Sequence, residues 1–240
     1  MRTPFQLPAN LELGTATAAL QIEGGDTNNS WYRWAEQGRI KDGSHCIVAA
    51  DHWNRVHEDV GLMRSLDMQH YRMSVEWSRI EPEPARFDEA AVAHYREELI
   101  ALREAGIRPL VTLHHFSQPL WFEDSGGWER ADAPLLFARF VREVAEALGA
   151  YVGDWVTINE PSVYLVMGYI FGEWPPGFTD IRRYLRAAKQ MIAAHHLAYA
   201  ELHRVSHRTD RSCRVGAAHH IRVFDPFRSG HPLDRCATAL

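Results

Sequence analysis

DWVTINEP, at residues 154–161, is an apolar run that ends in two polar residues and a proline. An apolar run of this length, rich in Trp, Val, Thr and Ile, favours a strand buried on both faces of a parallel sheet. We expect a strand over residues 154–159. Four further runs predict strands at residues 13–18, 69–74, 109–113 and 214–218.

Helical patterns separate these runs, because apolar residues recur every three or four positions between them. The third pattern begins near Pro134 and ends at Gly149, residues typical of helix ends. A fourth helix is expected from about residue 181 to residue 203. Alternating strands and helices predict βαβ units, a parallel sheet and the α/β class. The first three patterns are Trp53, Val56, Val60 and Met63; Val92, Tyr95, Leu99 and Leu102; and Leu136, Phe140, Val144 and Leu148.

The strand spacing predicts an incomplete TIM (β/α)₈ barrel. The five predicted strands use all 240 residues, or roughly 50 residues a unit, and eight such units would need on the order of 400 residues. We therefore expect residues 1–240 to form a single domain that contains the first five βα units. The sheet would have open edges, its inner face would be an apolar surface, and self-association or binding of a complementary barrel half would follow.

Composition narrows the function classes. The net charge is -5 and no run of Lys or Arg stands out, so nucleic acid and membranes are not expected partners. No segment approaches the roughly 18 apolar residues of a membrane span, and residues 1–5 lack the apolar stretch of a signal peptide. The cysteines, which are Cys46, Cys213 and Cys236, fit neither a disulfide framework nor a zinc site. We expect a cytoplasmic protein.

Glu160 is the sharpest candidate for chemistry. It follows the predicted strand at 154–159, and the carboxyl ends of the strands form the catalytic face of a barrel. Asn159 places an amide next to this acid, so that the amide can bind a sugar hydroxyl while the acid protonates a glycosidic oxygen. Taken alone, the triplet Asn-Glu-Pro could equally be a polar turn after a strand.

Four motifs in order resemble those of glycoside hydrolase family 1, and together they span nearly the whole chain. They are LGTATAALQIEGG at 13–25, YRMSVEWSRIEP at 71–82, TLHHFSQPLW at 112–121 and TINEP at 157–161. The resemblance implies a retaining β-glycosidase that hydrolyses β-glucosides or β-galactosides without a cofactor or metal. It does not distinguish glucose, galactose and phospho-sugars, nor does it identify the aglycone.

The resemblance also implies roles for individual residues. Glu160 would be the acid and then the base, while Gln21, His115 and Asn159 would bind sugar hydroxyls. Arg72 would contact the nucleophile. Each of the supporting residues has a plainer alternative: Gln21 as a polar turn residue, His115 as a core histidine and Arg72 as a structural ion-pair residue.

This sequence departs from the family pattern in two places. His115-Phe116-Ser117 stands where the family usually has His-Trp-Asp or His-Trp-Pro, so Phe116 keeps a ring but loses the indole N–H. The family's nucleophile motif, Ile/Val-Thr-Glu-Asn-Gly, does not occur. We therefore expect the acid/base half of an enzyme that is inactive alone. The alternatives are one half of a split enzyme and a non-catalytic carbohydrate-binding or interaction protein.

The remaining titratable residues favour no second site. None of the other glutamates near strand ends has the nucleophile's context, and surface or structural roles are expected for Glu23, Glu76, Glu123 and Glu173. The adjacent histidines at 195–196 and 219–220 lack the spacing of metal ligands, so no metal site is expected.

Overall fold

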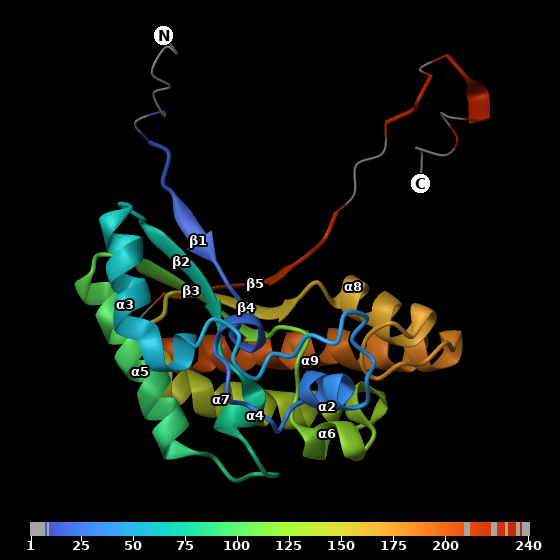
Figure 1. Ribbon diagram of the computed structural model, residues 1–240, viewed down its shortest axis with the longest axis horizontal. Helices are drawn as coiled ribbons and strands as arrows, with labels where there is room; N and C mark the ends of the chain where they lie inside the picture. Colours follow the sequence, from blue (N-terminus) through green and yellow to red (C-terminus); the bar gives the residue numbers. More distant parts are fainter. Residues whose placement is uncertain are drawn as a thin grey trace.

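A parallel sheet organises the described part of the chain. The computed structural model describes residues 8, 10–208, 212–221, 225–228, 230–233 and 236. These residues form a five-stranded parallel sheet in which each strand pairs with the next along the chain, so that the strand order is β1-β2-β3-β4-β5 (Figure 1). The strands are β1 (Gly14–Ala16), β2 (His70–Ser74), β3 (Arg108–His114), β4 (Asp154–Asn159) and β5 (Arg214–Ala218). All five predicted strands are confirmed.

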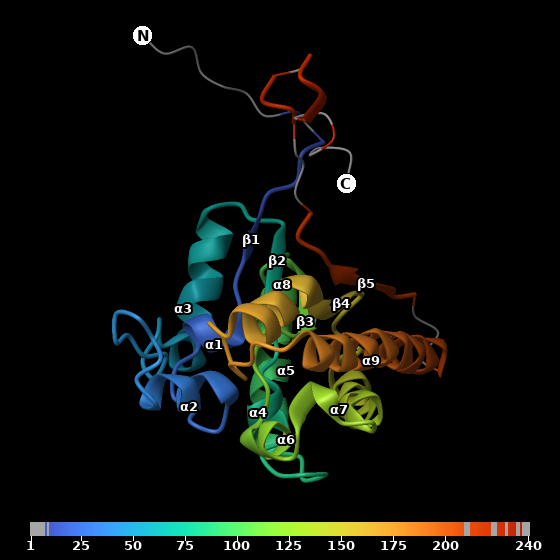
Figure 2. The same ribbon diagram turned by 90° about the vertical axis from the view of Figure 1, so that its right-hand side faces the viewer.

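The connections between the strands follow βαβ logic. The long helices are α3 (His52–Ser65), α5 (Glu89–Glu104), α7 (Ala133–Leu148) and α9 (Ile181–Arg208), which confirms the four predicted helices. Figures 1 and 2 show them around one side of the sheet, with β1 and β5 at opposite edges. Consecutive parallel strands with helices on the outside are the first five units of a (β/α)₈ barrel.

Short helical turns follow the carboxyl ends of the strands. They keep the connecting loops close to the carboxyl ends of the strands, where barrel enzymes build their sites. The turns are α1 (Ala19–Ile22), α2 (Ser30–Glu36), α4 (Trp77–Ile80), α6 (Leu120–Asp124), the 3₁₀ turn η1 (Gly127–Glu129), α8 (Pro161–Val166) and the π-helical turn η2 (Met167–Phe171).

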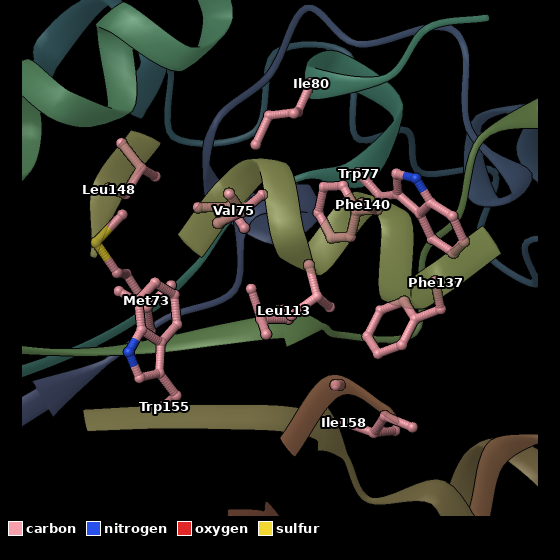
Figure 3. Packing of buried hydrophobic residues seen from close by; sticks show 14 of the residues in the cluster. Met73, Val75, Trp77, Ile80, Leu113, Phe137, Phe140, Leu148, Trp155 and Ile158 are labelled. Atoms are coloured by element: carbon pink, nitrogen blue, oxygen red, sulfur yellow. The ribbon is translucent and has the colours of Figure 1, made fainter. Parts of the chain in front are cut away.

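The hydrophobic core lies between the sheet and its helices. Met73, Leu113 and Ile158 come from three neighbouring strands and are all buried in one cluster that also contains residues of α7 (Figure 3). Trp77 of α4 joins the same core, where its ring stacks on that of Phe140 of α7 with centroids 5.1 Å apart. Aromatic rings of this size dominate core energetics. The core therefore fixes the sheet from the helix side and leaves the strand ends free for polar side chains.

The inner face of the sheet was expected to be an apolar surface, but it also contains charged side chains. A cavity of about 480 Å³ at this face is lined by Arg72, Asp154 and Arg214 together with apolar side chains. Arg214 forms a two-pronged ion pair with Asp154, with N–O distances of 2.6 and 2.7 Å. Neighbouring strands thus neutralise each other's charges here.

Among the described helices, none is long and apolar enough to cross a membrane.

Candidate active site

Polar side chains from three neighbouring strands meet at one end of the sheet. Arg72 on β2 donates from Nη2 to Oδ1 of Asn159 on β4, over 2.6 Å. The Arg72 Nε also donates to Oγ1 of Thr112 on β3, over 3.2 Å. Burial lowers the pKa of Arg72, while the nearby Glu160 carboxylate raises it. The structure therefore brings three of the predicted site residues, Arg72, Asn159 and Glu160, into one neighbourhood.

Glu160 stands at the junction of β4 and α8 in a sparsely populated backbone conformation. Its φ and ψ are 40° and 57°, in the left-handed region, and Pro161 opens the helix behind it. Its amide N–H donates to the Ala218 carbonyl at the end of β5, over 2.7 Å. Such conformations cost about 1–3 kcal/mol in a non-glycine residue and cluster at functional sites. The backbone thus holds the acid at the strand end.

The Glu160 carboxylate is accessible and has a histidine neighbour. Its side chain is 31% exposed, and His220 Nδ1 lies 3.7 Å from Oε1. His220 follows β5, beside which β4 has an irregular register between Val156 and Asn159. This carboxylate is therefore partly accessible to solvent. An accessible carboxyl group next to polar side chains can donate or accept a proton.

His115, at the end of β3, is held as a neutral imidazole. Burial, together with the nearby positive charge of Arg72, lowers the pKa of His115 to about 4. Its Nδ1 is buried and has no hydrogen-bond partner among the described residues. A buried polar atom without a partner in the protein calls for an outside one, such as water or a ligand hydroxyl. Its neighbour His114 is instead a core residue, with Nε2 3.2 Å from Gln118 Oε1.

Phe116 belongs to an aromatic group beside His115. Its φ is +69°, and its ring lies 5.0 Å from that of His115 and 5.0 Å from that of Trp174. The Phe116 carbonyl accepts a 2.9 Å hydrogen bond from Trp31 Nε1. The departure from the family's His-Trp pattern therefore leaves an aromatic surface in this position. An indole N–H near this position comes instead from Trp31 of α2.

Gln21 lies apart from these contacts. It belongs to α1, directly after β1, and it is exposed. Its backbone N–H donates to Ala18 O, whereas no hydrogen bond of its side chain is found among the described residues. The structure places Gln21 at the expected end of the sheet without connecting its side chain to the other candidates.

Of the four remaining glutamates, Glu23 and Glu76 are buried and Glu123 is half-buried, and their partners lie outside the candidate site. Glu23 pairs with Arg79, with Oε2 2.7 Å from Nε, and accepts from the Tyr95 hydroxyl over 2.8 Å. Glu76 accepts from Ser78 Oγ over 2.9 Å. Glu123 is bonded to the Gln118 amide over 2.5 Å, whereas Glu173 is exposed. Among the described residues, none of these glutamates has a contact with Glu160.

His220, Trp31 and Trp174 are not predicted as site residues by the sequence. His220 was considered only as half of a histidine pair for a metal, and no group of three or more His, Cys, Asp or Glu in the described residues could hold one. The available signals for the two tryptophans were GEWPPG at 172–177, rich in Gly and Pro, and SWYRW at 30–34, rich in aromatic residues. Neither segment carries a recognisable spacing.

Comparison with known proteins identifies the family. The family model for glycosyl hydrolase family 1 matches residues 3–239, and the chain belongs to this family. It is 32% identical over 228 residues to β-glucosidase A of Thermotoga maritima, which covers 92% of this chain and 50% of the relative. It is 38% identical over 177 residues to a coniferin β-glucosidase of Pinus contorta, covering 70% of this chain and 34% of the relative.

A solved structure agrees with this membership. The β-glucosidase of Thermotoga maritima in complex with deoxynojirimycin superposes with a TM-score of 0.90 at 30% identity, covering 97% of this chain and 53% of that one. The predicted family and the incomplete barrel are thereby confirmed. The chain spans about half the length of the curated relatives that it matches, and the site at its strand ends is about half of a barrel's catalytic face.

Proposed function

We propose that these residues are the acid/base half of a retaining β-glucosidase. The observation that carries the proposal is Glu160: it stands in the family's TINEP position at the carboxyl end of β4, is held in a left-handed conformation and remains accessible. Hydrolysis of a glycosidic bond requires a carboxyl group that protonates the leaving oxygen. Of the glutamates considered at the strand ends, Glu160 alone combines this position with the Arg72–Asn159 pair.

In this proposal Glu160 transfers the protons, and the neighbouring polar and aromatic residues bind the sugar. Glu160 protonates the departing oxygen and later takes a proton from the attacking water. Asn159, whose Oδ1 is already engaged by Arg72, has its amide N–H₂ available for a sugar hydroxyl. Neutral His115 can donate one hydrogen bond and accept another. Gln21 and Phe116 complete the sugar-binding side of the site.

The second carboxylate of a retaining mechanism lies outside this set of residues. A nucleophile must stand about 5–5.5 Å from the acid, on the other face of the sugar. None of the described glutamates contacts Glu160, and the nucleophile motif does not occur in the 240 residues. We propose that these residues alone do not turn over β-glucosides. The whole protein's activity would require the remaining barrel units, on the same chain or on another one.

The sheet edges favour a partner for this half barrel. In the described residues β1 pairs only with β2, and β5 pairs only with β4, so that each has one edge without a strand. Unpaired edges of this kind bind further strands. We propose that the complementary half of the barrel binds here. A carbohydrate-binding role without catalysis is the second candidate, favoured by the unpaired Nδ1 of His115.

The test uses the chain extended to the length of its relatives with the C-terminal half of β-glucosidase A from Thermotoga maritima. Hydrolysis of an aryl β-glucoside should appear on extension and should fall by about 10²-fold or more in Glu160→Gln. Glu104→Gln is the matched control, because Glu104 is exposed at the end of α5, which leads into the amino end of β3, whereas Glu160 follows the carboxyl end of β4. Equal activity of the two variants would remove Glu160 from the acid/base role, whereas activity of the unextended chain would overturn its description as half of a site.

A further inference from the structure

A second cavity lies beside the candidate site, between two loops that the family motifs do not include. Its volume is about 510 Å³, and its walls come from residues 31–41 after β1 and residues 172–174 after η2. The side chains that matter below are Trp31, Trp34, Arg39, Lys41, Glu173 and Trp174. A cavity of this size accommodates a ring-sized part of a ligand.

Aromatic rings connect this cavity to the candidate site. The Trp31 and Trp174 rings, which both line the cavity, lie edge to face with centroids 5.4 Å apart. Trp174 in turn lies 5.0 Å from Phe116, which adjoins His115. The Trp31 Nε1 bond to the Phe116 carbonyl fixes the loop after β1 to the end of β3. The row of rings Phe116, Trp174 and Trp31 therefore runs from the candidate site into the cavity.

The charge of the cavity wall is predominantly positive. Arg39 and Lys41 are both exposed, and neither forms an ion pair with a described residue, whereas Glu173 is the one acidic side chain in the wall. The nearby acids have other partners: Glu36 pairs with His45 at 2.9 Å, and Asp42 accepts from the Ser44 amide. The wall therefore has two cations and one carboxylate, and none of the three forms an ion pair with a described residue.

The position of Arg39 is set by packing. Its guanidinium lies over the Trp34 ring, 4.5 Å from the centroid, and Trp34 is only 6% exposed. Gly177 packs on the same ring, since a Cβ there would come within 2.6 Å of Trp34. A stacked guanidinium keeps its N–H groups available for hydrogen bonds in its plane. Arg39 is thus held in place for an anionic group that enters the cavity.

We propose that this cavity is a subsite for the distal part of the leaving group, and that it accepts an aromatic ring bearing a carboxylate. The ring would lie against Trp31 and Trp174, and the carboxylate would bind Arg39 and Lys41. The assignment rests on the proposed glycosidase function, since it makes the cavity an extension of the aglycone side. It adds a preference for acidic aryl leaving groups.

The test is direct binding of a simple acidic ring to the 240-residue chain. 2-Naphthoate and its neutral analogue 2-naphthamide are titrated, with quenching of tryptophan fluorescence as the signal. Naphthoate should bind more tightly than the amide, and Lys41→Met and Arg39→Met should each weaken naphthoate binding by about three-fold or more, which is the size expected for a partly exposed ion pair. Binding of the amide should not change.

The chain offers a matched control, because its only two lysines are Lys41 and Lys189 and the latter is exposed on α9. Lys189→Met should bind naphthoate as the parent chain does, and near-ultraviolet circular dichroism checks that each variant is folded. Equal affinity for the acid and the amide, or equal loss in the Lys41 and Lys189 variants, would overturn the proposal. No hydrolysis is measured, so failure here leaves the role of Glu160 untouched.

Discussion

Arg72 Nη2 donates a 2.6 Å hydrogen bond to Oδ1 of Asn159, and this bond joins the second strand of the sheet to the fourth. Asn159 directly precedes Glu160, so the bond fixes the residue on which the acid's position depends. Asn159 is 3% exposed, and water cannot readily replace the guanidinium. The arginine therefore has a positioning role in this half of the barrel.

Arg72→Met should destabilise the chain by about 1–3 kcal/mol, because it leaves a buried amide oxygen without its donor. Arg214→Met is the control: its ion pair with Asp154 lies on the same face of the sheet, but the Arg214 side chain is 78% exposed, and the expected cost is about 0–1 kcal/mol. Urea unfolding of the two variants checks this. Equal losses would show that the Asn159 contact contributes nothing beyond that of an exposed pair.

Much of this arrangement could be predicted from the sequence. The strand at 154–159 and the polar residues after it placed Asn159 and Glu160 at the carboxyl edge, where Arg72 and His115 from neighbouring strands had to lie near them. His220 could not be predicted in the same way, because its approach to Glu160 depends on the irregular register between β4 and β5. Trp31 reaches the site through a loop contact with Phe116 that no periodicity encodes.

Glu76 should make a contribution to the stability of the chain that decreases as the pH rises. Burial, with Asp26 and Glu23 nearby, raises the pKa of Glu76 from 4.5 to about 8. The folded state thus keeps a proton that the unfolded state has lost. Its stabilising contribution is complete below about pH 4.5 and is lost as the pH rises to about 8.

Glu76→Gln removes this titration, so its free energy of unfolding should depend less on pH between about pH 5 and pH 8 than that of the parent chain. The variant should gain most, relative to the parent, at the alkaline end. Urea unfolding across this range, with Glu104→Gln as the exposed control, measures the difference. A parallel pH dependence in Glu76→Gln and the parent would show that Glu76 does not carry a raised pKa.

A side chain at Gly177 should destabilise the chain for two reasons, a strained backbone conformation and a steric clash. Its φ is +82°, and an added Cβ would lie 2.6 Å from the Trp34 ring. Gly38 has a φ of +69° with nothing within 4 Å, so Gly38→Ala incurs the conformational cost alone, about 1–2 kcal/mol. Gly177→Ala should lower the melting temperature clearly more than Gly38→Ala. Equal shifts would mean that the loop at 172–178 does not pack on Trp34.

The central claim is that Glu160 protonates the leaving group, and the dependence on the leaving group tests it most directly. In the chain extended to family length, Glu160→Ala should slow cellobiose hydrolysis by about 10²–10⁴-fold. The glucose that departs is a poor leaving group unless its glycosidic oxygen is protonated. A 2,4-dinitrophenyl β-glucoside, whose dinitrophenolate leaves without protonation, should form the glycosyl-enzyme at a nearly unchanged rate. Azide should then accelerate turnover and give β-glucosyl azide. An equal loss on both substrates, with no acceleration and no azide product, would contradict the assignment of Glu160.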